Sequence, residues 1–426
     1  MDVNLTRVDE PNILFNEFWV RDQIEIEKDL AWYRANQPVC FVPEPIMPEG
    51  SPIPQGAGTW VLTRHDDIIE VSRNPEIFSS AQGITVLDSP PEFNEFFSSM
   101  IAMDDPRHAR LRRIVSKGFT PRMLQRLEDS VQKVAANIVD DICTLGEIDF
   151  IVDVAAALPL KIVCDLMGIP ESRYQEVFDC SNVILGAGDP EYVPPEGNIL
   201  EAILNAGFAL QGIMNEVADS KRGKNSDDLT SALVNAELED DQLTNSDLAG
   251  FFILLVVAGN ETTRNAIGWG LQYLTENPDQ QKIWMEDFEK VTPTAVEEIV
   301  RLASPVTYMR RTATKDTVLR DQQIKAGDKV CMFYLAANRD EDVFEDPYHF
   351  NVLRHPNNHV GFGGPGPHFC LGAHLARRGI AVIFRELFNR LPDIKATGKP
   401  EPLAASFIHG VKHLPAAFTP MGKNPL

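Results

Sequence analysis

The sequence predicts a mainly α-helical protein with small β-sheets. Helical patterns alternate with short breaks over residues 121–240, and one unbroken helical pattern runs from Thr244 to Asn277. A helix of that length would span about 50 Å, which is the length of a domain. The strand-like segments are short and lie elsewhere, at Thr59–Thr63, between Tyr308 and Val330, and beyond Arg390.

Length and composition bound the class of protein. The 426 residues are 44% hydrophobic and 24% charged, an ordinary globular composition with enough length for a large core. The length alone would allow about two or three domains, but motifs far apart in the sequence must meet at one site, so we predict that residues 1–426 form a single domain. The net charge of −23 is opposite in sign to that of nucleic-acid binders and favours solubility.

Neither a membrane anchor nor a disulfide framework is expected. The N-terminal residues are acidic and contain no long apolar run, and the longest apolar segment, Leu248–Gly259, is too short to span a bilayer. The six cysteines are widely separated and form no CxxC pair. This indicates a reducing compartment, with five cysteines as thiols in the core and one as a ligand. We therefore expect a soluble, cytoplasmic protein.

The N-terminal part predicts a helix, an irregular segment and a small strand–helix unit. The helix is expected over Phe18–Ala35, and the Pro-rich segment Val39–Pro54 is expected to be irregular. Thr59–Thr63 has the composition of a strand, and His65–Arg73 indicates a short helix. The apolar stretch 81–103 contains a Pro pair and is expected to be a long loop, a kind of segment that is often functional.

Pro106 lies near the expected start of the next helix, on which two basic residues share a face. His108 and Arg112 are four residues apart, so their side chains are neighbours on the helix surface. The nearby Arg110 and Arg113 point elsewhere and are expected to be solvated.

The long helix from Thr244 begins with the spacing of a capping box, completed by Asp247. Its middle, LAGFFILLVVAG, is apolar on every side, so we expect it to cross the core.

Polar residues then appear abruptly, in Ala258–Thr263 (AGNETT). Glu261 and Thr262 place a carboxylate and a hydroxyl where burial without purpose would cost on the order of a few kcal/mol. Gly259 leaves room beside a ligand. The structural alternative is a capped kink in a long helix.

The segment Phe362–Gly372 reads FGGPGPHFCLG. Its glycines and prolines predict a stiff, tight loop whose backbone can approach a flat ligand closely. A helix beginning just after Cys370 would direct free N–H groups and the positive end of its dipole at the sulfur, which favours the metal-binding thiolate. His368 can hydrogen-bond an anionic group beside it. A buried structural cysteine after a Gly-rich turn is the alternative.

Two further motifs lie between these segments. Glu298 and Arg301 form an acid–base pair three residues apart, which alone would indicate only a surface salt bridge. Downstream, Phe344–Phe350 and Arg354 follow. In this order the four motifs resemble those of the cytochrome P-450 family, the haem-thiolate monooxygenases, although Phe362 lies eight residues before Cys370, one more than the commonest spacing.

The resemblance implies the mostly α, triangular haem-thiolate fold with small β-sheets, haem b as cofactor and Cys370 as the iron ligand. By the same resemblance, Glu261 and Thr262 deliver protons during dioxygen activation. Glu298, Arg301 and Arg354 are implied to be a structural triad that braces the haem loop. The residues expected beside the haem or its propionates are His108, Arg112, Ala258, Gly259, Arg311, Phe362, His368 and Gly372, with Arg310 as the rival of Arg311.

The loop 81–103 is implied to cover the substrate pocket. For any single residue of this loop, packing of an apolar loop on the surface explains its apolar character about as well as a position in the pocket. The residues expected to line the pocket are Ile84, Val86, Leu87, Phe93, Phe97, Met100, Leu255, Val306, Met309 and Phe407.

The implied activity is insertion of one oxygen atom of dioxygen into an apolar C–H bond. The segments FFILLVVAGNETTRNA and GFGGPGPHFCLG resemble the bacterial sterol and methyl-branched-lipid omega-hydroxylases, which suggests the terminal carbon of a branched lipid, isoprenoid or sterol side chain. The implied partners are a ferredoxin and an NAD(P)H-dependent ferredoxin reductase, with a monomeric enzyme in a bacterial cytoplasm. Basic residues on the cysteine side are expected to dock the carrier, among them Arg113, Lys117 and Arg377.

Two other functions stay open. A haem-thiolate peroxygenase or nitric oxide reductase would not need the Glu261–Thr262 pair, which argues against either. A non-enzymatic haem sensor would not need a large apolar lid, so the loop 81–103 argues against that alternative.

Overall fold

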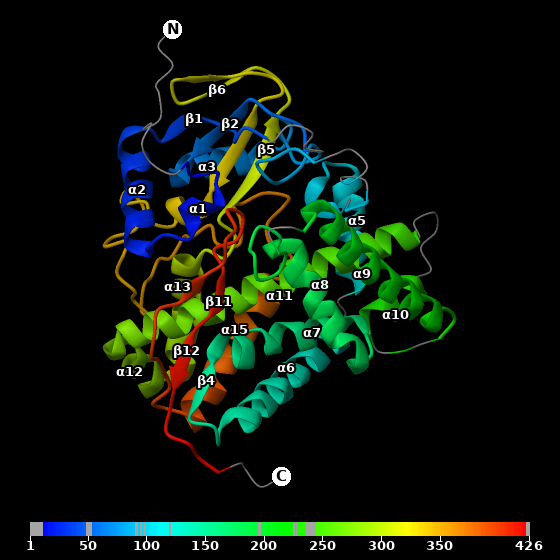
Figure 1. Cartoon of the computed structure of the whole chain (residues 1–426), viewed down its shortest axis with the longest axis vertical. Helices are drawn as coiled ribbons and strands as arrows, with labels where there is room; N and C mark the ends of the chain where they lie inside the picture. The colour runs from blue at the N-terminus through cyan, green and yellow to red at the C-terminus, as the bar shows by residue number, and fades with distance from the viewer. Residues whose placement is uncertain are drawn as a thin grey trace.

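A computed structural model describes residues 12–422, apart from 48–52, 90–92, 94–95, 98, 119–120, 195–196, 225, 227 and 236–243. The strands of the largest sheet gather at one end of the molecule with α1, α2 and α3, and the remaining helices form the larger part beyond them (Figure 1). The described helices are α1 (Asn16–Trp19), α2 (Gln23–Asn36), α3 (His65–Arg73), α5 (Arg107–Gly118), α6 (Pro121–Ile142), α7 (Ala157–Met167), α8 (Tyr174–Gly186), α9 (Ile199–Lys221), α10 (Leu229–Val234), α11 (Asn245–Glu276), α12 (Pro278–Glu286), α13 (Phe288–Ala303), α14 (Tyr334–Ala337) and α15 (Ala373–Arg390).

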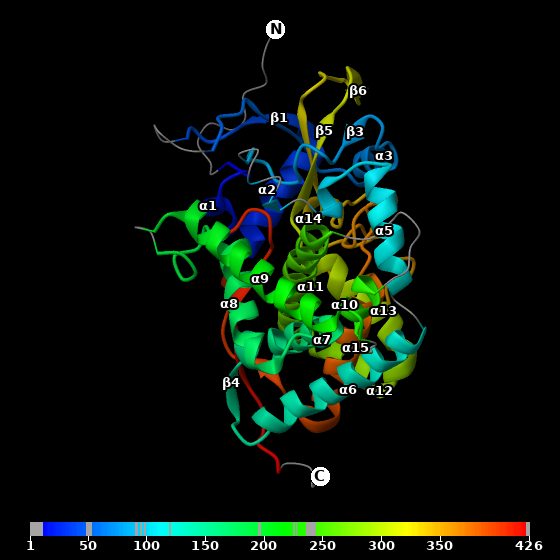
Figure 2. The same ribbon diagram turned by 90° about the vertical axis from the view of Figure 1, so that its right-hand side faces the viewer.

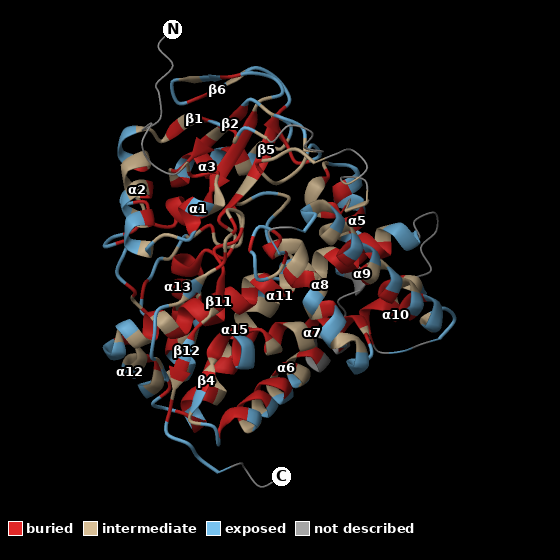
Figure 3. Ribbon diagram, in the orientation of Figure 1, coloured by how far each residue is buried: buried red, intermediate tan, exposed pale blue. Residues whose placement is uncertain are grey.

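The helix α11 organises the helical part. Thr244 caps it as predicted: its hydroxyl accepts the Asp247 N–H (3.0 Å), and the Asp247 carboxylate accepts the Thr244 N–H (3.1 Å). The helix packs against α7, α8, α9, α13 and α15. In two views α8 and α9 lie on one flank of α11 and α13 lies on the other (Figures 1 and 2). Figure 3 shows buried residues along most of its length, so α11 crosses the core as expected.

The largest sheet has five strands in the order β1-β2-β8-β5-β3. The strands β2 and β8 are parallel, and the other pairs are antiparallel. Within β5, Arg310 and Arg311 pair with Cys331 and Val330 of β8 and therefore point to opposite faces. The bounds are β1 (Val39–Pro43), β2 (Gly58–Leu62), β3 (Phe78–Ser79), β5 (Tyr308–Ala313) and β8 (Lys329–Phe333).

Three small sheets complete the described strands. β10 and β11 form a hairpin whose connecting loop carries Phe407, and β12 continues from β11 toward the far end of the molecule (Figure 1). The pairings are β6 (Thr317–Leu319) with β7 (Gln322–Ile324), β10 (Glu401–Pro402) with β11 (Val411–His413), and β4 (Glu147–Asp149) with β12 (Pro415–Ala417) and β9 (Lys395–Ala396).

Two predictions for the N-terminal part were wrong in detail. The expected helix Phe18–Ala35 is divided into α1 and α2, because the Asp22 carboxylate accepts the Ile24 N–H (3.0 Å) and starts a new helix. The first five residues of the segment expected to be irregular form β1, which pairs along its whole length with β2. In the described part of the chain, no helix is long and apolar enough to cross a membrane.

Candidate active site

The cysteine loop leads directly into α15, as predicted. Gly372 is the N-cap of that helix, and the amides of Gly372 and Ala373 donate hydrogen bonds to the Cys370 sulfur. The loop is pressed against α3: a Cβ on Gly366, whose φ is +159°, would lie 2.2 Å from the Ser72 carbonyl oxygen. A side chain at this position would therefore displace the loop that carries the cysteine.

Cys370 differs electrostatically from other cysteines of the chain. It is exposed on one side, and the protein that surrounds it on the others raises the pKa of its thiol. The two amides and the charges of Arg112 and Arg377 oppose that rise. Burial raises the pKa of Cys40, Cys164 and Cys331 to about 12. Among these four thiols, only Cys370 is exposed, and the two amides and two arginines counteract part of the effect of burial, so it is the thiol best placed to bind a metal.

The middle of α11 has one open face. Ala258 is exposed, and Leu255, Gly259 and Thr262, on the same face, are partly exposed, whereas Val256, Asn260 and Glu261 are buried. The Thr262 hydroxyl donates a hydrogen bond to the Ala258 carbonyl oxygen (2.6 Å), which orients its lone pairs. A Cβ on Gly259 would contact Val163 of α7 at 3.0 Å.

Glu261 is buried on a neighbouring side of α11. Its carboxylate accepts a hydrogen bond from Arg264 (2.8 Å), and both side chains are only 4% exposed. Arg264 also donates to Asn182 of α8 (3.0 Å) and to the Tyr192 hydroxyl in the loop after α8 (3.2 Å). Burial acts against the charge of Arg264, but Glu261 and Tyr192 outweigh it and raise the arginine pKa. The acid of AGNETT is thus connected to the segment that covers α11.

The basic pair on α5 lies beside the cysteine loop. The His108 ring is buried and its centre is 4.2 Å from that of His368. Arg112 donates to the carbonyl oxygen of Phe369 (2.7 Å), the residue before the cysteine. His368 contacts the Ser80 hydroxyl (3.1 Å), and burial, assisted by nearby cations, lowers its pKa to about 3, so its ring is neutral at pH 7.

The two arginines of β5 have different environments. Arg310 donates to the Asp88 carboxylate (2.7 Å) and so holds the start of the lid loop. Arg311 is 7% exposed. Among the described residues, no carboxylate lies within 4.0 Å of its guanidinium group. Burial lowers the pKa of Arg311. Because a buried charge without a counter-ion is strongly unfavourable, Arg311 is the better placed of the two to hold an anionic group of a ligand.

The expected pocket residues fall into two groups. Val86 and Met100 are buried within hydrophobic clusters. Phe407 lies 5.5 Å, ring centre to ring centre, from Tyr308. The lid loop contacts α9, where a Cβ on Gly207 would lie 2.6 Å from the Phe96 ring. The partly buried members are Ile84, Leu87, Phe93, Phe97, Leu255, Val306, Met309 and Phe407.

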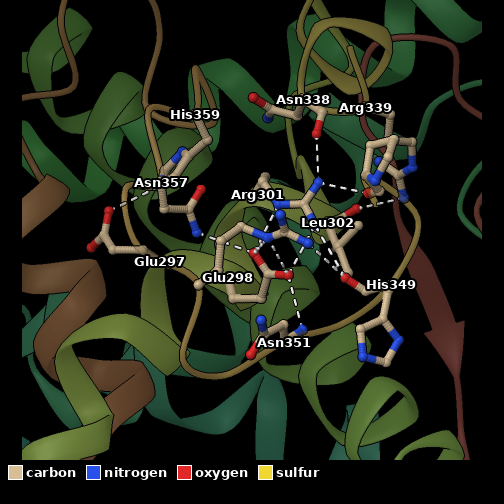
Figure 4. Close-up of polar contacts among 12 residues, drawn as sticks. Glu297, Glu298, Arg301, Leu302, Asn338, Arg339, His349, Asn351, Asn357 and His359 are labelled. Carbon is tan, nitrogen blue, oxygen red and sulfur yellow. Dashed lines mark hydrogen bonds and ion pairs between the residues drawn. The ribbon is translucent and has the colours of Figure 1, made fainter. Parts of the chain in front are cut away.

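Glu298, Arg301 and Arg354 form one buried cluster. Figure 4 shows Glu298 beside Arg301. Both Glu298 oxygens accept from Arg301 (2.8 and 2.9 Å) and from the Nε of Arg354 (3.0 and 3.1 Å). Arg301 also donates to the carbonyl oxygens of Asn338 and Pro347, each at 2.7 Å. The cluster ties α13 to the chain that leads into the cysteine loop.

Several neighbours were not recognised in the sequence. Arg264 follows Glu261 by three residues, so helix spacing alone could have indicated it. Tyr192 and Asn182 lie far away in the sequence, where no local pattern marks them. Arg377, expected to dock a redox carrier, is bonded to Glu297 and covers the Phe362 ring. The Lys117 side chain lies outside the described residues.

Residues 197–392 match the family model of cytochrome P-450. The chain is 46% identical over 406 residues to the methyl-branched lipid omega-hydroxylase of Mycobacterium tuberculosis, covering 95% of this chain and 93% of that protein. It is 39% identical over 374 residues to the steroid C26-monooxygenase of the same species, covering 85% and 83%.

A solved structure supports the same relationship. A cytochrome P-450 of Mycobacterium marinum in complex with pseudoionone superposes with a TM-score of 0.90 at 40% identity, covering 97% of this chain and 100% of that one. Identity at this level over nearly the whole length, together with an exposed thiol at a helix start and the open face of α11, leads to one conclusion. The chain belongs to the cytochrome P-450 family and is a monooxygenase that uses haem b as its cofactor.

Proposed function

We propose that this enzyme hydroxylates the terminal carbon of a methyl-branched lipid, an isoprenoid or a sterol side chain. The observation that carries the proposal is the 46% identity to a methyl-branched lipid omega-hydroxylase, because it extends over 95% of the chain. The apolar character of the expected lining agrees with such a substrate.

The residues present fit a haem. The Cys370 sulfur would ligate the iron, and Ala258 and Gly259, on the open face of α11, would leave space for the group. Arg311 would neutralise a propionate, with His108 and Arg112 at the neighbouring edge. The haem supplies the activation of dioxygen, and the chain supplies binding, orientation and the control of protons.

Proton delivery is proposed for Thr262 and Glu261. The Thr262 hydroxyl is oriented by its hydrogen bond to Ala258 and lies on the open face of α11. Glu261 is held by Arg264, so the transfer of a proton through its carboxylate requires this ion pair to open. These environments fit a division of roles. The Thr262 hydroxyl would act at the oxygen-binding side of α11, and the Glu261 carboxylate would exchange protons with water outside the site.

The electrons must come from a redox partner. We propose a ferredoxin with an NAD(P)H-dependent reductase, and a monomeric enzyme in a bacterial cytoplasm. With reductant and dioxygen, purified enzyme is expected to form hydroxylated product, whereas a peroxygenase would form it from hydrogen peroxide alone. Product formation that depends only on peroxide would contradict the proposal.

A spectral titration identifies the substrate class. Methyl-branched fatty acids, acyclic isoprenoids and cholesterol-type sterols are added to the haem-loaded enzyme, with unbranched fatty acids of equal length as the matched control. We expect branched compounds to bind and to give a low-spin to high-spin change, and the product to carry a terminal hydroxyl by mass spectrometry. Equal binding of unbranched chains, or hydroxylation inside the chain, would contradict the proposed class.

Arg311 and Arg310 provide a paired test of haem binding. Arg311→Met is expected to increase the rate at which haem is lost to a scavenging protein by about tenfold to a hundredfold, since it removes a charge-assisted hydrogen bond. Arg310→Met loosens the loop 81–103 instead, because it removes one of the two cations paired with Asp88 and leaves only Lys329. If Arg310→Met loses haem faster than Arg311→Met, the two arginines are assigned the wrong way round.

A further inference from the structure

Two side chains flank the ring of Phe362 behind the cysteine loop. Arg377, in α15, places its guanidinium carbon 4.4 Å from the ring centre. The imidazole of His359 contacts the same ring, with the two ring centres 5.8 Å apart. Phe362 itself packs against the main hydrophobic core, so its ring is enclosed between the core and a cation.

Glu297 holds both of these side chains. Its carboxylate accepts two hydrogen bonds from Arg377, one of them from Nη2 at 3.0 Å, and one from His359 Nε2 at 2.8 Å. The Gly361 amide donates to His359 Nδ1 (3.0 Å), so the ring proton lies on Nε2 and points at Glu297. Burial raises the pKa of Glu297, but these donors outweigh it and lower the pKa to about 2. Figure 4 shows Glu297 and His359 beside the Glu298 cluster.

The backbone of Phe362 is directly connected to Cys370. The Cys370 N–H donates to the Phe362 carbonyl oxygen at 3.0 Å. A shift of Phe362 would therefore move the residue that carries the sulfur. The Arg377 charge also opposes the rise in the Cys370 pKa that burial produces.

We propose that Glu297, His359 and Arg377 form a clamp on Phe362 that fixes the position of the Cys370 sulfur, with Arg377 as its positioning residue. The clamp acts on the position of the sulfur through Phe362, whose carbonyl oxygen accepts the Cys370 N–H. The proposal rests on the assignment of Cys370 as the iron ligand. It gives Arg377 a structural task on the cysteine side, in place of the docking of a redox carrier.

The helix α15 offers a matched control. Arg385, two turns further along, lies 5.2 Å from the centre of the Phe288 ring and is bonded to Glu289 at 2.8 Å. Arg385→Met therefore removes the same two kinds of interaction from the same helix, away from the cysteine. Arg377→Met, Arg377→Lys and Glu297→Gln alter the clamp itself.

The test follows the absorbance band that haem-loaded, reduced protein shows with carbon monoxide at about 450 nm when sulfur is the ligand. During mild heating, Arg377→Met is expected to lose this band about two- to fivefold faster than the wild type, the factor that corresponds to an exposed cation–π contact. Glu297→Gln is expected to accelerate the loss as well. Arg377→Lys should lie between, because lysine keeps the charge but lacks the planar face. Arg385→Met should match the wild type.

Two results would overturn the clamp. One is a wild-type rate of band loss in both Arg377→Met and Glu297→Gln. The other is equal acceleration in Arg385→Met, since general loosening of α15 would then explain the effect. Far-UV circular dichroism monitors folding, and Glu297→Gln decides the matter if Arg377→Met does not fold. If wild-type protein itself lacks the band, the ligand assignment fails, and the clamp fails with it.

Discussion

Replacing Glu298 by alanine is expected to lower the free energy of unfolding by about 3–5 kcal/mol, because it leaves two buried guanidinium groups without their counter-ion. Glu298 and Arg301 are completely buried, and Arg354 is 9% exposed. The carboxylate also accepts hydrogen bonds from the Asn351 amide (3.0 Å) and the Asn357 side chain (3.1 Å). Chemical denaturation of the haem-loaded protein measures the loss.

The control for Glu298 is an ion pair of similar length on the surface. Asp316 and Lys325 are 2.8 Å apart, and each side chain is 63% exposed. Asp316→Asn is expected to change stability by less than about 1 kcal/mol. If Glu298→Ala is no more destabilising than Asp316→Asn, the buried cluster does not brace the haem loop.

Acid should weaken the same cluster. Burial raises the pKa of Glu298, but Arg301 and Arg354 outweigh it and hold the pKa below the ordinary value for a carboxyl. The stabilising contribution of Glu298 is therefore fully present above that ordinary value and is lost as the pH falls through the folded-state pKa.

Replacing Thr262 by valine is expected to reduce product formation per NAD(P)H by about a hundredfold, the lower end of the usual contribution of a positioned proton-transfer group. The change keeps the shape of the side chain and removes its hydroxyl. In place of hydroxylation, dioxygen is expected to take up two electrons and two protons and to be released as hydrogen peroxide. Product and peroxide are measured in the same reaction with the reconstituted redox partners.

Thr263→Val is the matched control for Thr262→Val. Thr263 is the next residue, and its methyl group packs 3.8 Å from the Cβ position of Gly379 in α15. We expect product formation near the wild-type value in this variant. If Thr262→Val forms as much product per NAD(P)H as the wild type, or if both variants lose product equally, the Thr262 hydroxyl takes no part in proton transfer.

Local signals could be predicted from the sequence because their causes lie within a few residues. The start of α11 depends on Thr244 and Asp247, and the start of α15 follows directly after the Gly372 cap. The family motifs likewise indicated the meeting of Glu298, Arg301 and Arg354, which the structure brings together. That residues 1–426 form a single domain stays a prediction.

Features that depend on distant partners could not be predicted. Val39–Pro43 forms a strand because β2 pairs with it, although the prolines that follow indicated an irregular segment. The difference between Arg310 and Arg311 depends on Asp88, which lies on the lid loop. Arg377 is a cation of the kind usually found on the surface, and its contact with Glu297, 80 residues away, could not be recognised in the sequence.

The central claim is that the Cys370 thiolate holds haem iron while oxygen chemistry takes place beside the open face of α11. The most direct test is the spectrum of folded, reduced, haem-loaded wild-type protein exposed to carbon monoxide, compared with Cys370→Ala. The account predicts a band at about 450 nm in the wild type and its absence in the variant. Folded wild-type protein without this band, or a variant that retains it, would contradict the account.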